Sequence, residues 1–128
     1  MISISKESTD DFESRIGGDP RFGADFRFLG AVRDVEDGRK ISGIDYSCYE
    51  PMAREMLQKI CDEMMAEEPD HEVLIHHRIG FVAAGVPSIV IRVLTRHSQP
   101  GFELCREYLK RIKKTVPIWK KPVFVGET

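Results

Sequence analysis

Residues 73–95 read VLIHHRIGFVAAGVPSIVIRVLT, and this stretch decides the fold class. Two runs rich in Val, Ile and Leu, 73–79 and 88–95, enclose the turn-forming segment AAGVP. Each run has the length and composition of a β-strand. The centre of the chain is therefore predicted to contribute two strands.

Helical patterns lie on both sides of these strands. Before them, Pro51 suits the first turn of a helix that stops ahead of Pro69. Its apolar stripe comprises Met52, Ala53, Met56, Leu57, Ile60, Cys61 and Met64. A methionine-rich stripe can form an adaptable binding groove, but apolar residues at helical spacing favour ordinary core packing.

After the strands, Pro100-Gly101 opens a second helix. This helix must end before Val116, because a residue that precedes proline is disfavoured in the α conformation. Its predicted buried stripe is Phe102, Cys105, Tyr108, Leu109 and Ile112. The segment 117–125, PIWKKPVFV, is then predicted to be an extended terminal strand.

The N-terminal half supplies further strands. MISISK alternates like a short strand, and the polar residues after it can cap a short helix. Residues 24–32 carry apolar side chains at every second position, which is typical of a strand with one face in the core. Asp37-Gly38 predicts a hairpin turn, with residues 41–49 returning as the partner strand.

The order of these elements predicts the fold class. The later part of the chain runs strand, helix, strand, strand, helix, strand, which is a split βαβ pattern. We therefore expect an α+β fold with a mainly antiparallel sheet. With a length of 128 residues, the chain is expected to be a single domain, 1–128, with one core.

Composition argues against several protein classes. No apolar run approaches the roughly 20 residues that a membrane-spanning helix needs. The N-terminal MISISKESTDD is too acidic for a signal peptide. Cys48, Cys61 and Cys105 are odd in number and widely spaced, which argues against a disulfide framework and a zinc site. We therefore expect a cytoplasmic protein that does not bind a membrane.

Charge is distributed unevenly along the chain. The net charge is −2, yet residues 92–121 carry nine Lys and Arg against two acidic residues, a local charge of +7. This region is therefore expected to meet anions. Nucleic acid is one candidate, but the aromatic residues of the last helix are predicted to lie on its core side rather than among its basic residues, which disfavours that alternative.

The decapeptide KKTVPIWKKP, residues 113–122, gathers four lysines around a proline and the only tryptophan. At 100° per residue, Lys113 lies at the edge of the buried stripe in the last turn, where we expect it to be partly desolvated. Lys120 follows Trp119 in the extended segment, so their side chains point to opposite faces. Since Pro117 turns the chain, Lys113 and Lys120 can form two walls of one cleft. A lysine stem along the core edge and a charged edge strand are the structural alternatives.

The four histidines do not read as a metal site. His76 and His77 are adjacent on a predicted strand and point to opposite faces, while His71 and His97 have no neighbour at ligand spacing. The sequence also lacks the glycine-rich patterns of nucleotide-binding proteins and the Gly-x-Ser-x-Gly pattern of hydrolases. We expect neither a metal nor a bound cofactor.

Five motifs, in order along nearly the whole chain, resemble the MoaE family, the large catalytic subunit of molybdopterin synthase. They are FLGAVRD with Phe28, Gly30, Val32 and Arg33; YEPMA with Met52-Ala53; HRIG from His77 to Gly80; RH followed by GF, with His97 and Phe102; and KKTVPIWKK with Lys113, Pro117, Trp119 and Lys120. Each motif alone is weak, and the five together in this order are specific.

The resemblance implies a sulfurtransferase with an α/β hammerhead fold and an additional small antiparallel β subdomain. Members of the family insert two sulfurs into cyclic pyranopterin monophosphate, which gives the dithiolene of molybdopterin. The sulfur arrives as a thiocarboxylate on the C-terminal glycine of a small ubiquitin-like partner subunit. Two large subunits form a homodimer, which becomes a heterotetramer with the small subunits.

The resemblance also assigns roles by motif position. Lys113 and Lys120 are the expected catalytic residues and also bind substrate: one holds the thiocarboxylate or its adduct, and the other neutralises charge or transfers a proton at the pterin. Arg33 is expected to grip the phosphate or pterin oxygens with its guanidinium fork. His97 is expected to orient substrate or to shuttle a proton.

Three positions depart from the family pattern. Ser98 stands where an arginine usually follows His97, which removes one anion contact, and Arg96 points to the other strand face. Val86 and Pro122 stand where acidic residues are usual. These departures leave an alternative open, in which a catalytically weakened chain serves as a binding module for the ubiquitin-like subunit.

Overall fold

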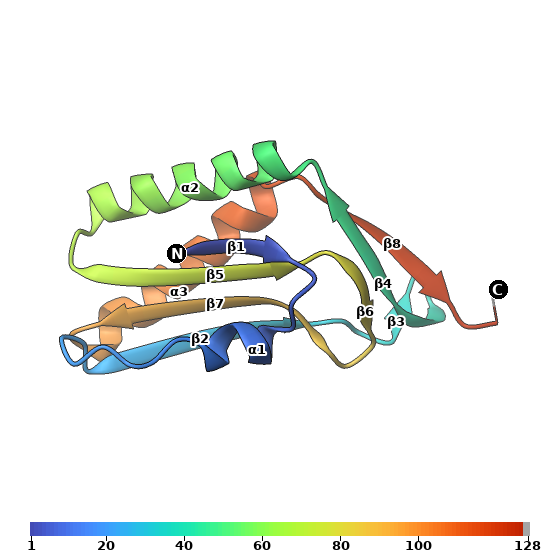
Figure 1. The fold of residues 1–128 in the computed structure, drawn as a ribbon, viewed down its shortest axis with the longest axis horizontal. Coiled ribbons are helices and arrows are strands. Elements are labelled where there is room, and N and C mark those ends of the chain that lie inside the picture. The colour runs from blue at the N-terminus through green and yellow to red at the C-terminus, as the bar shows by residue number, and fades with distance from the viewer. Residues whose placement is uncertain (127–128) are drawn as a thin grey trace.

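The computed structural model describes residues 1–126, which form two β-sheets and three helices (Figure 1). Along the chain the elements are β1 (Ile2–Ser5), α1 (Thr9–Ser14), β2 (Ala24–Ala31), β3 (Val35–Glu36), β4 (Arg39–Cys48), α2 (Glu50–Glu67), β5 (His71–Arg78), β6 (Gly80–Ala83), β7 (Pro87–Thr95), α3 (Ser98–Thr115) and β8 (Ile118–Phe124). Apart from the parallel pair β1 and β5, the described strands pair antiparallel. The predicted α+β class is confirmed.

The first sheet has the strand order β1-β5-β7-β2. In Figure 1, α3 passes behind this sheet and α1 lies in front of it, while α2 runs along the β1 side. The face toward α2 and α3 carries the main core, because alternate residues of each strand point the same way. This core includes Val73, Ile75, Ile89, Ile91 and Val93 from the strands and Ala53, Leu57, Leu104, Tyr108 and Ile112 from the helices.

The second sheet is the small antiparallel subdomain, and β4 is its central strand. β4 pairs with β3, β6 and β8. A separate core forms here from Val32, Ile41, Ile44, Tyr46 and Val82. The chain passes from β5 into β6 at Gly80, whose φ of 85° lies in the left-handed region that favours glycine. This turn allows neighbouring strands of the chain to serve two different sheets.

The hairpin turn at Asp37-Gly38 is confirmed, but one predicted strand pairing is wrong. Both residues have positive φ, 52° and 73°, as a type I′ turn requires. The turn joins β4 to the two-residue strand β3, whereas β2 pairs with β7 rather than with β4. The physical reason is a register shift after Gly30, which takes the chain out of the first sheet before the hairpin begins. The sequence prediction also missed β6.

The last helix ends as predicted, at Thr115, but its first turn faces the sheet differently. Phe102 is 65% exposed, so its predicted burial is wrong, and Gly101 and Leu104 are buried instead. A Cβ at Gly101 would collide with the ring of Phe26, so the helix start approaches β2 too closely for a larger residue to fit without a shift. Phe102 covers the Phe26 ring from outside, with ring centroids 4.2 Å apart.

The other elements follow the prediction. The N-terminal strand and short helix are β1 and α1, and the Ser8 hydroxyl caps α1 by accepting a hydrogen bond from Asp11 N at 3.1 Å. The residues of the α2 stripe that lie buried are Ala53, Leu57, Ile60, Cys61 and Met64, which confirms core packing. All three cysteines are free. Within the described range, no helix has the length and apolar character needed to cross a membrane.

Candidate functional site

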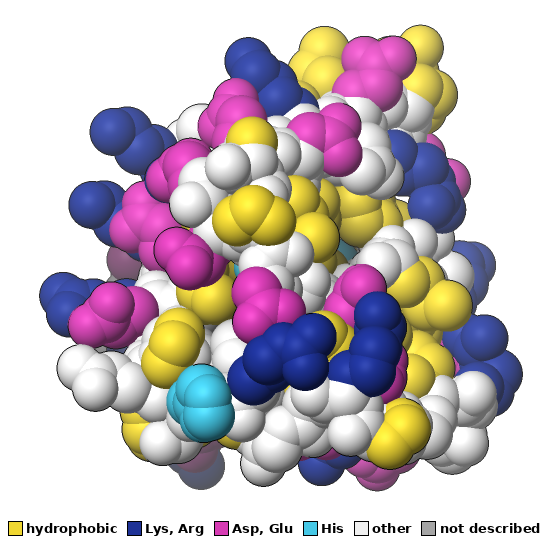
Figure 2. All heavy atoms as spheres, turned by 90° about the vertical axis from the view of Figure 1, so that its left-hand side faces the viewer, with side chains coloured by type: hydrophobic (Ala, Val, Ile, Leu, Met, Phe, Trp, Pro, Cys, Tyr) yellow, Lys and Arg dark blue, Asp and Glu magenta, His cyan; other side chains and the backbone are white. Residues whose placement is uncertain are grey.

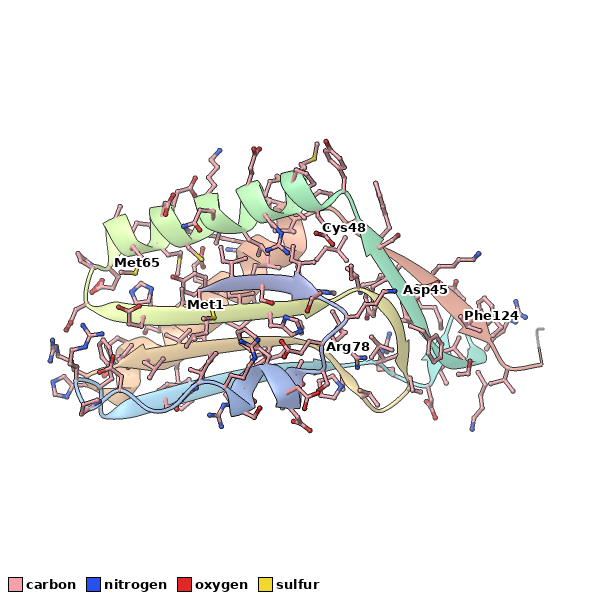
Figure 3. All side chains as sticks on the ribbon, viewed as in Figure 1. Met1, Asp45, Cys48, Met65, Arg78 and Phe124 are labelled. Atoms are coloured by element: carbon pink, nitrogen blue, oxygen red, sulfur yellow. The ribbon has the colours of Figure 1, made fainter. Side chains whose placement is uncertain are left out.

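A cavity of about 580 Å³ opens where the two sheets meet the end of α3. Its walls come from the end of β2, from β4, β5 and β7, from the last two turns of α3, and from β8. In Figure 3 the first sheet meets the second between the labelled residues Arg78, at the end of β5, and Asp45, in β4. Because strands of both sheets and the end of α3 converge here, a shift of any of these elements changes the shape of the cavity.

Lys113 reaches the cavity from the last turn of α3. Leu109 and Val116 line the same wall, since residues three or four apart share a helix face. The helix stops there because Pro117 holds Val116 in an extended conformation, with φ −83° and ψ 121°. The predicted partial desolvation of Lys113 is wrong: the residue is exposed, because the cavity opens to solvent along this wall.

Lys120 reaches the cavity from β8. It lies opposite Tyr46 in the ladder between β4 and β8, and directly opposed residues point to the same face of a sheet. Tyr46 is buried in the cavity wall, so Lys120 lines the cavity as well. Trp119 points the other way and is 61% exposed. The predicted opposite orientation of Lys120 and Trp119 is confirmed, and both lysines line one cavity.

Arg33 reaches the cavity because the chain leaves β2 just before it. After the register shift at Gly30, Val32 is anchored to the turn between β6 and β7: its N–H donates to Val86 O at 3.0 Å, and its carbonyl accepts from Gly85 N at 2.7 Å. Val32 is 4% exposed and belongs to the second core. Arg33 follows it and lines the cavity.

Much of the remaining wall is apolar and closely fitted. Phe28, Ile89 and Ile118 contribute to it. A Cβ at Gly30 would come 2.7 Å from Ile89 Cγ2, so glycine suits the position where β2 packs closely against the Ile89 side chain. Apolar walls lower the local dielectric, which makes each charge in the cavity interact more strongly than it does in water.

No carboxylate offsets the three cations of the cavity. None of the residues that line it is Asp or Glu. Within residues 1–126, the side chains of Lys113, Lys120 and Arg33 take part in no salt bridge or hydrogen bond, whereas those of Arg92 and Arg111 each pair with a carboxylate. Three unpaired cations beside apolar walls form a site for an anionic ligand.

The sequence analysis missed three polar residues of this cavity, Tyr46, His77 and Ser88. The ring of His77 is 7% exposed and meets the Tyr46 ring edge-on, with centroids 5.1 Å apart. Burial is the main cause that lowers the pKa of His77 to about 4. A signal was present in the sequence: alternation places His77 on the same strand face as Val73 and Ile75, so a histidine continues an apolar stripe.

His97, the fourth predicted site residue, does not line this cavity. It is the N-cap residue of α3, whereas Lys113 lies in the last turn of the same helix. The two residues are therefore about 24 Å apart along the helix, at 1.5 Å per residue. Within one chain, the structure brings Lys113, Lys120 and Arg33 together and leaves His97 apart.

A second hollow of similar size lies at the other end of α3. It measures about 560 Å³, and its lining includes Glu67, Glu68, Glu103 and Glu107. Figure 2 looks at this end of the molecule and shows acidic side chains gathered on one side of it. Carboxylates in this number repel anions, and the described residues include no group of three or more His, Cys, Asp or Glu placed to hold a metal ion.

Comparisons with known proteins point to one family. The family model described as MoaE protein matches residues 3–115. The molybdopterin synthase catalytic subunit of Drosophila willistoni is 37% identical over 111 residues, which is 86% of this chain and 30% of that protein. The corresponding subunit of Pyrococcus abyssi is 38% identical over 96 residues, 75% of this chain and 65% of that protein. The chain thus spans about 30% of the length of the Drosophila relative.

Solved structures agree with this assignment. The molybdopterin synthase from Staphylococcus aureus superimposes with a TM-score of 0.85 at 30% identity, covering 98% of this chain and 91% of that one. A complex of subunits 1 and 2 of the molybdopterin-converting factor from Helicobacter pylori contains a chain with a TM-score of 0.74 at 21% identity, covering 98% and 90%. At that identity the second likeness concerns the fold alone.

Proposed function

Because the chain belongs to the MoaE family, we propose that it transfers sulfur from the C-terminal thiocarboxylate of a small ubiquitin-like subunit to cyclic pyranopterin monophosphate, which forms the dithiolene of molybdopterin. The observation that carries the proposal is the cavity with three unpaired cations and no carboxylate. Both reactants are anionic, since one bears a phosphate and the other ends in a thiocarboxylate. A cavity of this charge attracts both to the same place.

Lys113 and Lys120 supply positive charge where the reaction develops negative charge. When a thiocarboxylate sulfur attacks a carbon of the pterin side chain, charge builds on an oxygen of the substrate and later on the leaving group. Two ammonium groups from different elements flank this space, one on α3 and one on β8. Charges fixed beside apolar walls stabilise such a transition state more than water does.

Arg33 is the proposed ligand of the phosphate or the pterin oxygens. A guanidinium presents a planar fork of N–H donors that matches two oxygens of a phosphate at once. The preceding residue, Val32, is held by two backbone hydrogen bonds, which fix the position from which the Arg33 side chain enters the cavity. This contact is made to the bound substrate and to the transition state alike, so we expect Arg33 to contribute mainly to binding.

The proposed role of His97 requires a second copy of the chain. Within one chain the imidazole and the cavity lie at opposite ends of α3. In the homodimer that the family resemblance implies, His97 would enter the cavity of the partner copy. Ser98 would accompany it there, and supplies a hydroxyl where relatives usually carry an arginine.

The proposed partner is the ubiquitin-like subunit, whose extended C-terminal tail carries the sulfur. The cavity opens to solvent beside Lys113, and the tail enters on this side. The proposed compartment is the cytoplasm. Three free cysteines, among them the partly exposed Cys48 and Cys105, fit a reducing environment.

Reconstitution tests this function. The purified chain is mixed with cyclic pyranopterin monophosphate and with a ubiquitin-like carrier that ends in a glycine thiocarboxylate, and mass spectrometry follows the gain of two sulfurs. Product is expected when all three components are present, and none is expected from a carrier that ends in an ordinary carboxylate. Carrier binding without sulfur transfer would instead support the binding-module alternative, and neither binding nor product would contradict the proposal.

A further inference from the structure

The three buried histidines use their ring nitrogens differently. His71 donates from Nδ1 to Glu68 O at 2.6 Å, and its Nε2 meets the Tyr108 hydroxyl at 2.6 Å. His76 donates from Nε2 to Glu7 O at 2.7 Å, and its Nδ1 meets the Ser3 hydroxyl at 2.9 Å. In both rings, one nitrogen carries the proton and the other accepts a hydroxyl hydrogen. Both histidines are fully satisfied and hold neighbouring segments against β5.

His77 uses only one of its two nitrogens. Its Nδ1 lies 2.7 Å from Arg78 O, and because a carbonyl can only accept, Nδ1 must carry the proton. Nε2 of the neutral ring is then an acceptor, and no hydrogen bond reaches it from any residue in the range 1–126. The fully buried side-chain atoms without a hydrogen-bond partner among the described residues are Glu13 Oε1 and Arg78 Nε, so Nε2 of His77 is not sealed in the core but accessible. Here the ring lines the cavity, so a molecule in the cavity can supply the missing hydrogen bond.

The position of His77 also departs from the pattern of its strand. Val73 and Ile75 precede it on the same face and pack into the main core. The next position on that face lies at the cavity, and a histidine occupies it. A leucine or valine would close this wall without any unpaired polar atom. Core packing therefore does not account for an imidazole at residue 77.

The other polar groups of the cavity cannot accept a proton readily. Lysine ammonium and arginine guanidinium groups have no free lone pair. Tyr46 and Ser88 offer hydroxyls, which are far weaker bases than an imidazole, and the Ser88 hydroxyl donates to Gly30 O at 3.3 Å. Among the cavity-lining residues of the described chain, His77 is therefore the one neutral base.

Sulfur transfer creates a step that needs such a base. Once the thiocarboxylate sulfur has bonded to a substrate carbon, the carrier tail and the substrate are joined through a thioester. To release the product, water oxygen must bond to the acyl carbon of the tail, and the carbon–sulfur bond must break with its electron pair going to sulfur. The products are a carboxylate and a thiolate, so the water gives up both of its protons: one to a base as its oxygen bonds to the acyl carbon, and the second to solvent when the carboxylic acid ionises. No oxidant or reductant is required.

We propose that Nε2 of His77 accepts the proton of the water that cleaves this acyl–sulfur bond, with Nδ1 held by the Arg78 carbonyl. The inference rests on the proposed function and adds to it a catalytic residue and a step. Lys113 and Lys120 stabilise the oxyanion that forms when water adds, and the imidazolium returns its proton to the leaving thiolate or to solvent.

The electrostatic surroundings make this base responsive to the ligand. The charged and titratable groups around the ring are Tyr46, His76, Arg78, Lys113, Lys120 and Arg33. Burial, together with the charges of His76 and Lys120, keeps the pKa of the empty site low, at about 4, although the Arg78 carbonyl acts in the opposite direction. Anions bound beside the ring favour the imidazolium and raise this pKa. His77 thus becomes a better proton acceptor once thiocarboxylate and phosphate are bound.

The variant His77→Asn separates structure from catalysis. The asparagine amide can replace the Nδ1–H donor toward the Arg78 carbonyl, but it has no atom at the Nε2 position. In the reconstituted reaction, mass spectrometry follows two species, the covalent carrier–substrate adduct and the released product. We expect adduct formation within about threefold of wild type and release slowed by roughly 10²-fold or more, so that the adduct accumulates. Lys114→Ala, an exposed residue outside the cavity, controls for general effects.

The pH dependence of release and its rescue by imidazole test the role of His77 independently. In wild type, the rate of release should fall on acidification as the imidazole of the loaded site becomes protonated, and this acid limb should be absent from His77→Asn. Added imidazole should restore release in His77→Gly. If His77→Asn does not fold, His77→Gln is assayed in its place, with the same expected accumulation of adduct.

The outcomes distinguish this inference from the proposed function. Product release by a folded His77→Asn or His77→Gln variant within threefold of wild type, without accumulated adduct, overturns the role of His77 and leaves the proposed function intact. A wild-type chain that gives neither adduct nor product overturns the proposed function, and this inference with it.

Discussion

Two hollows of almost the same size, about 560 and 580 Å³, lie toward the two ends of α3. Carboxylates line the first and cations line the second. At the N-terminal end, Glu67 and Glu107 are held by Arg111, with N–O distances of 2.9 to 3.0 Å. At the C-terminal end, Lys113 and Lys120 have no partner within the described residues. Volume therefore does not distinguish the two places. They differ in the sign of their charge, and two of the four glutamates of the first hollow are paired, whereas neither lysine of the second has a partner among the described residues.

The paired charges of the first hollow have a structural role. Arg111 of α3 pairs with Glu67 of α2 and with Glu107 of its own helix, so these charges hold the two helices together. The helix dipole favours a cation at the C-terminal end, but it favours Lys114 as much as Lys113, and only Lys113 lines the cavity. We therefore propose that the unpaired cations, which come from three separate segments, serve a ligand rather than stability.

The largest effect is expected from the two lysines of the cavity. Lys113→Ala and Lys120→Ala should each lower the rate of product formation by roughly 10²- to 10³-fold, because each removes a charge that stabilises the transition state. Reconstitution with single-turnover analysis measures this rate. Lys114→Ala and Lys121→Ala are matched controls on the same elements, outside the cavity lining, and should change the rate less than twofold. Equal losses of rate in the cavity variants and in the controls would contradict a specific role of the two cavity lysines.

A smaller effect is expected from Arg33. Arg33→Ala should raise KM for the pterin substrate by roughly tenfold, with less change in kcat, because the contact is made in the ground state and the transition state alike. Arg33→Lys keeps the charge but loses the planar fork, and should recover part of this loss. A variant whose kcat falls while KM stays constant would show that Arg33 acts on the chemical step instead.

At the other end of α3, a packing variant should lower stability. Gly101→Ala places a Cβ against the Phe26 ring and should lower the free energy of unfolding by about 1–3 kcal/mol, as measured by urea denaturation. Gly18→Ala, where nothing lies within 4 Å, is the control and should change stability much less. Activity per folded molecule of Gly101→Ala is a separate readout, because the same end of α3 carries His97, which in the proposed homodimer enters the cavity of the partner copy.

The smallest effect concerns the ion pairs of the acidic groove. The hydrogen bond from Arg111 lowers the pKa of Glu67, so the pair stabilises the protein above the ordinary carboxylate pKa and stops doing so as pH falls through the lowered value. Arg111→Ala should therefore lower Tm by about 2 °C at pH 7 and by less in acid or in high salt. Thermal unfolding at pH 7 and pH 3 measures the difference. A gap that widens in acid would contradict the role of this pair.

Local periodicity in the sequence predicted most of the helices and strands, but it could not predict which distant strands pair. Alternation in residues 24–32 correctly indicates a strand with one buried face, but it does not say which strand lies beside it. The hairpin turn made β4 the nearest candidate, whereas β2 pairs with β7, more than 50 residues away in the sequence. The error at Phe102 has a similar origin, because the close approach of Gly101 to Phe26 is a property of two elements together.

The site was predictable to the extent that single elements orient its residues. Helix geometry placed Lys113 beside the buried stripe, and strand alternation separated Lys120 from Trp119. Arg33 came from the family resemblance alone, because its direction depends on a register shift that has no signal in the sequence. His77 was read for metal binding and set aside, although its place on an apolar face is visible in the alternation of β5.

The central claim is that the unpaired cations at the C-terminal end of α3 hold the anionic substrate. Titration calorimetry with cyclic pyranopterin monophosphate tests this directly, in the wild type, in the double variant Lys113→Ala/Lys120→Ala and in the control Lys114→Ala/Lys121→Ala. The substrate is expected to bind saturably to the wild type and to the control, and to bind the cavity variant with at least tenfold weaker affinity. Equal affinity of all three proteins for the substrate would contradict it.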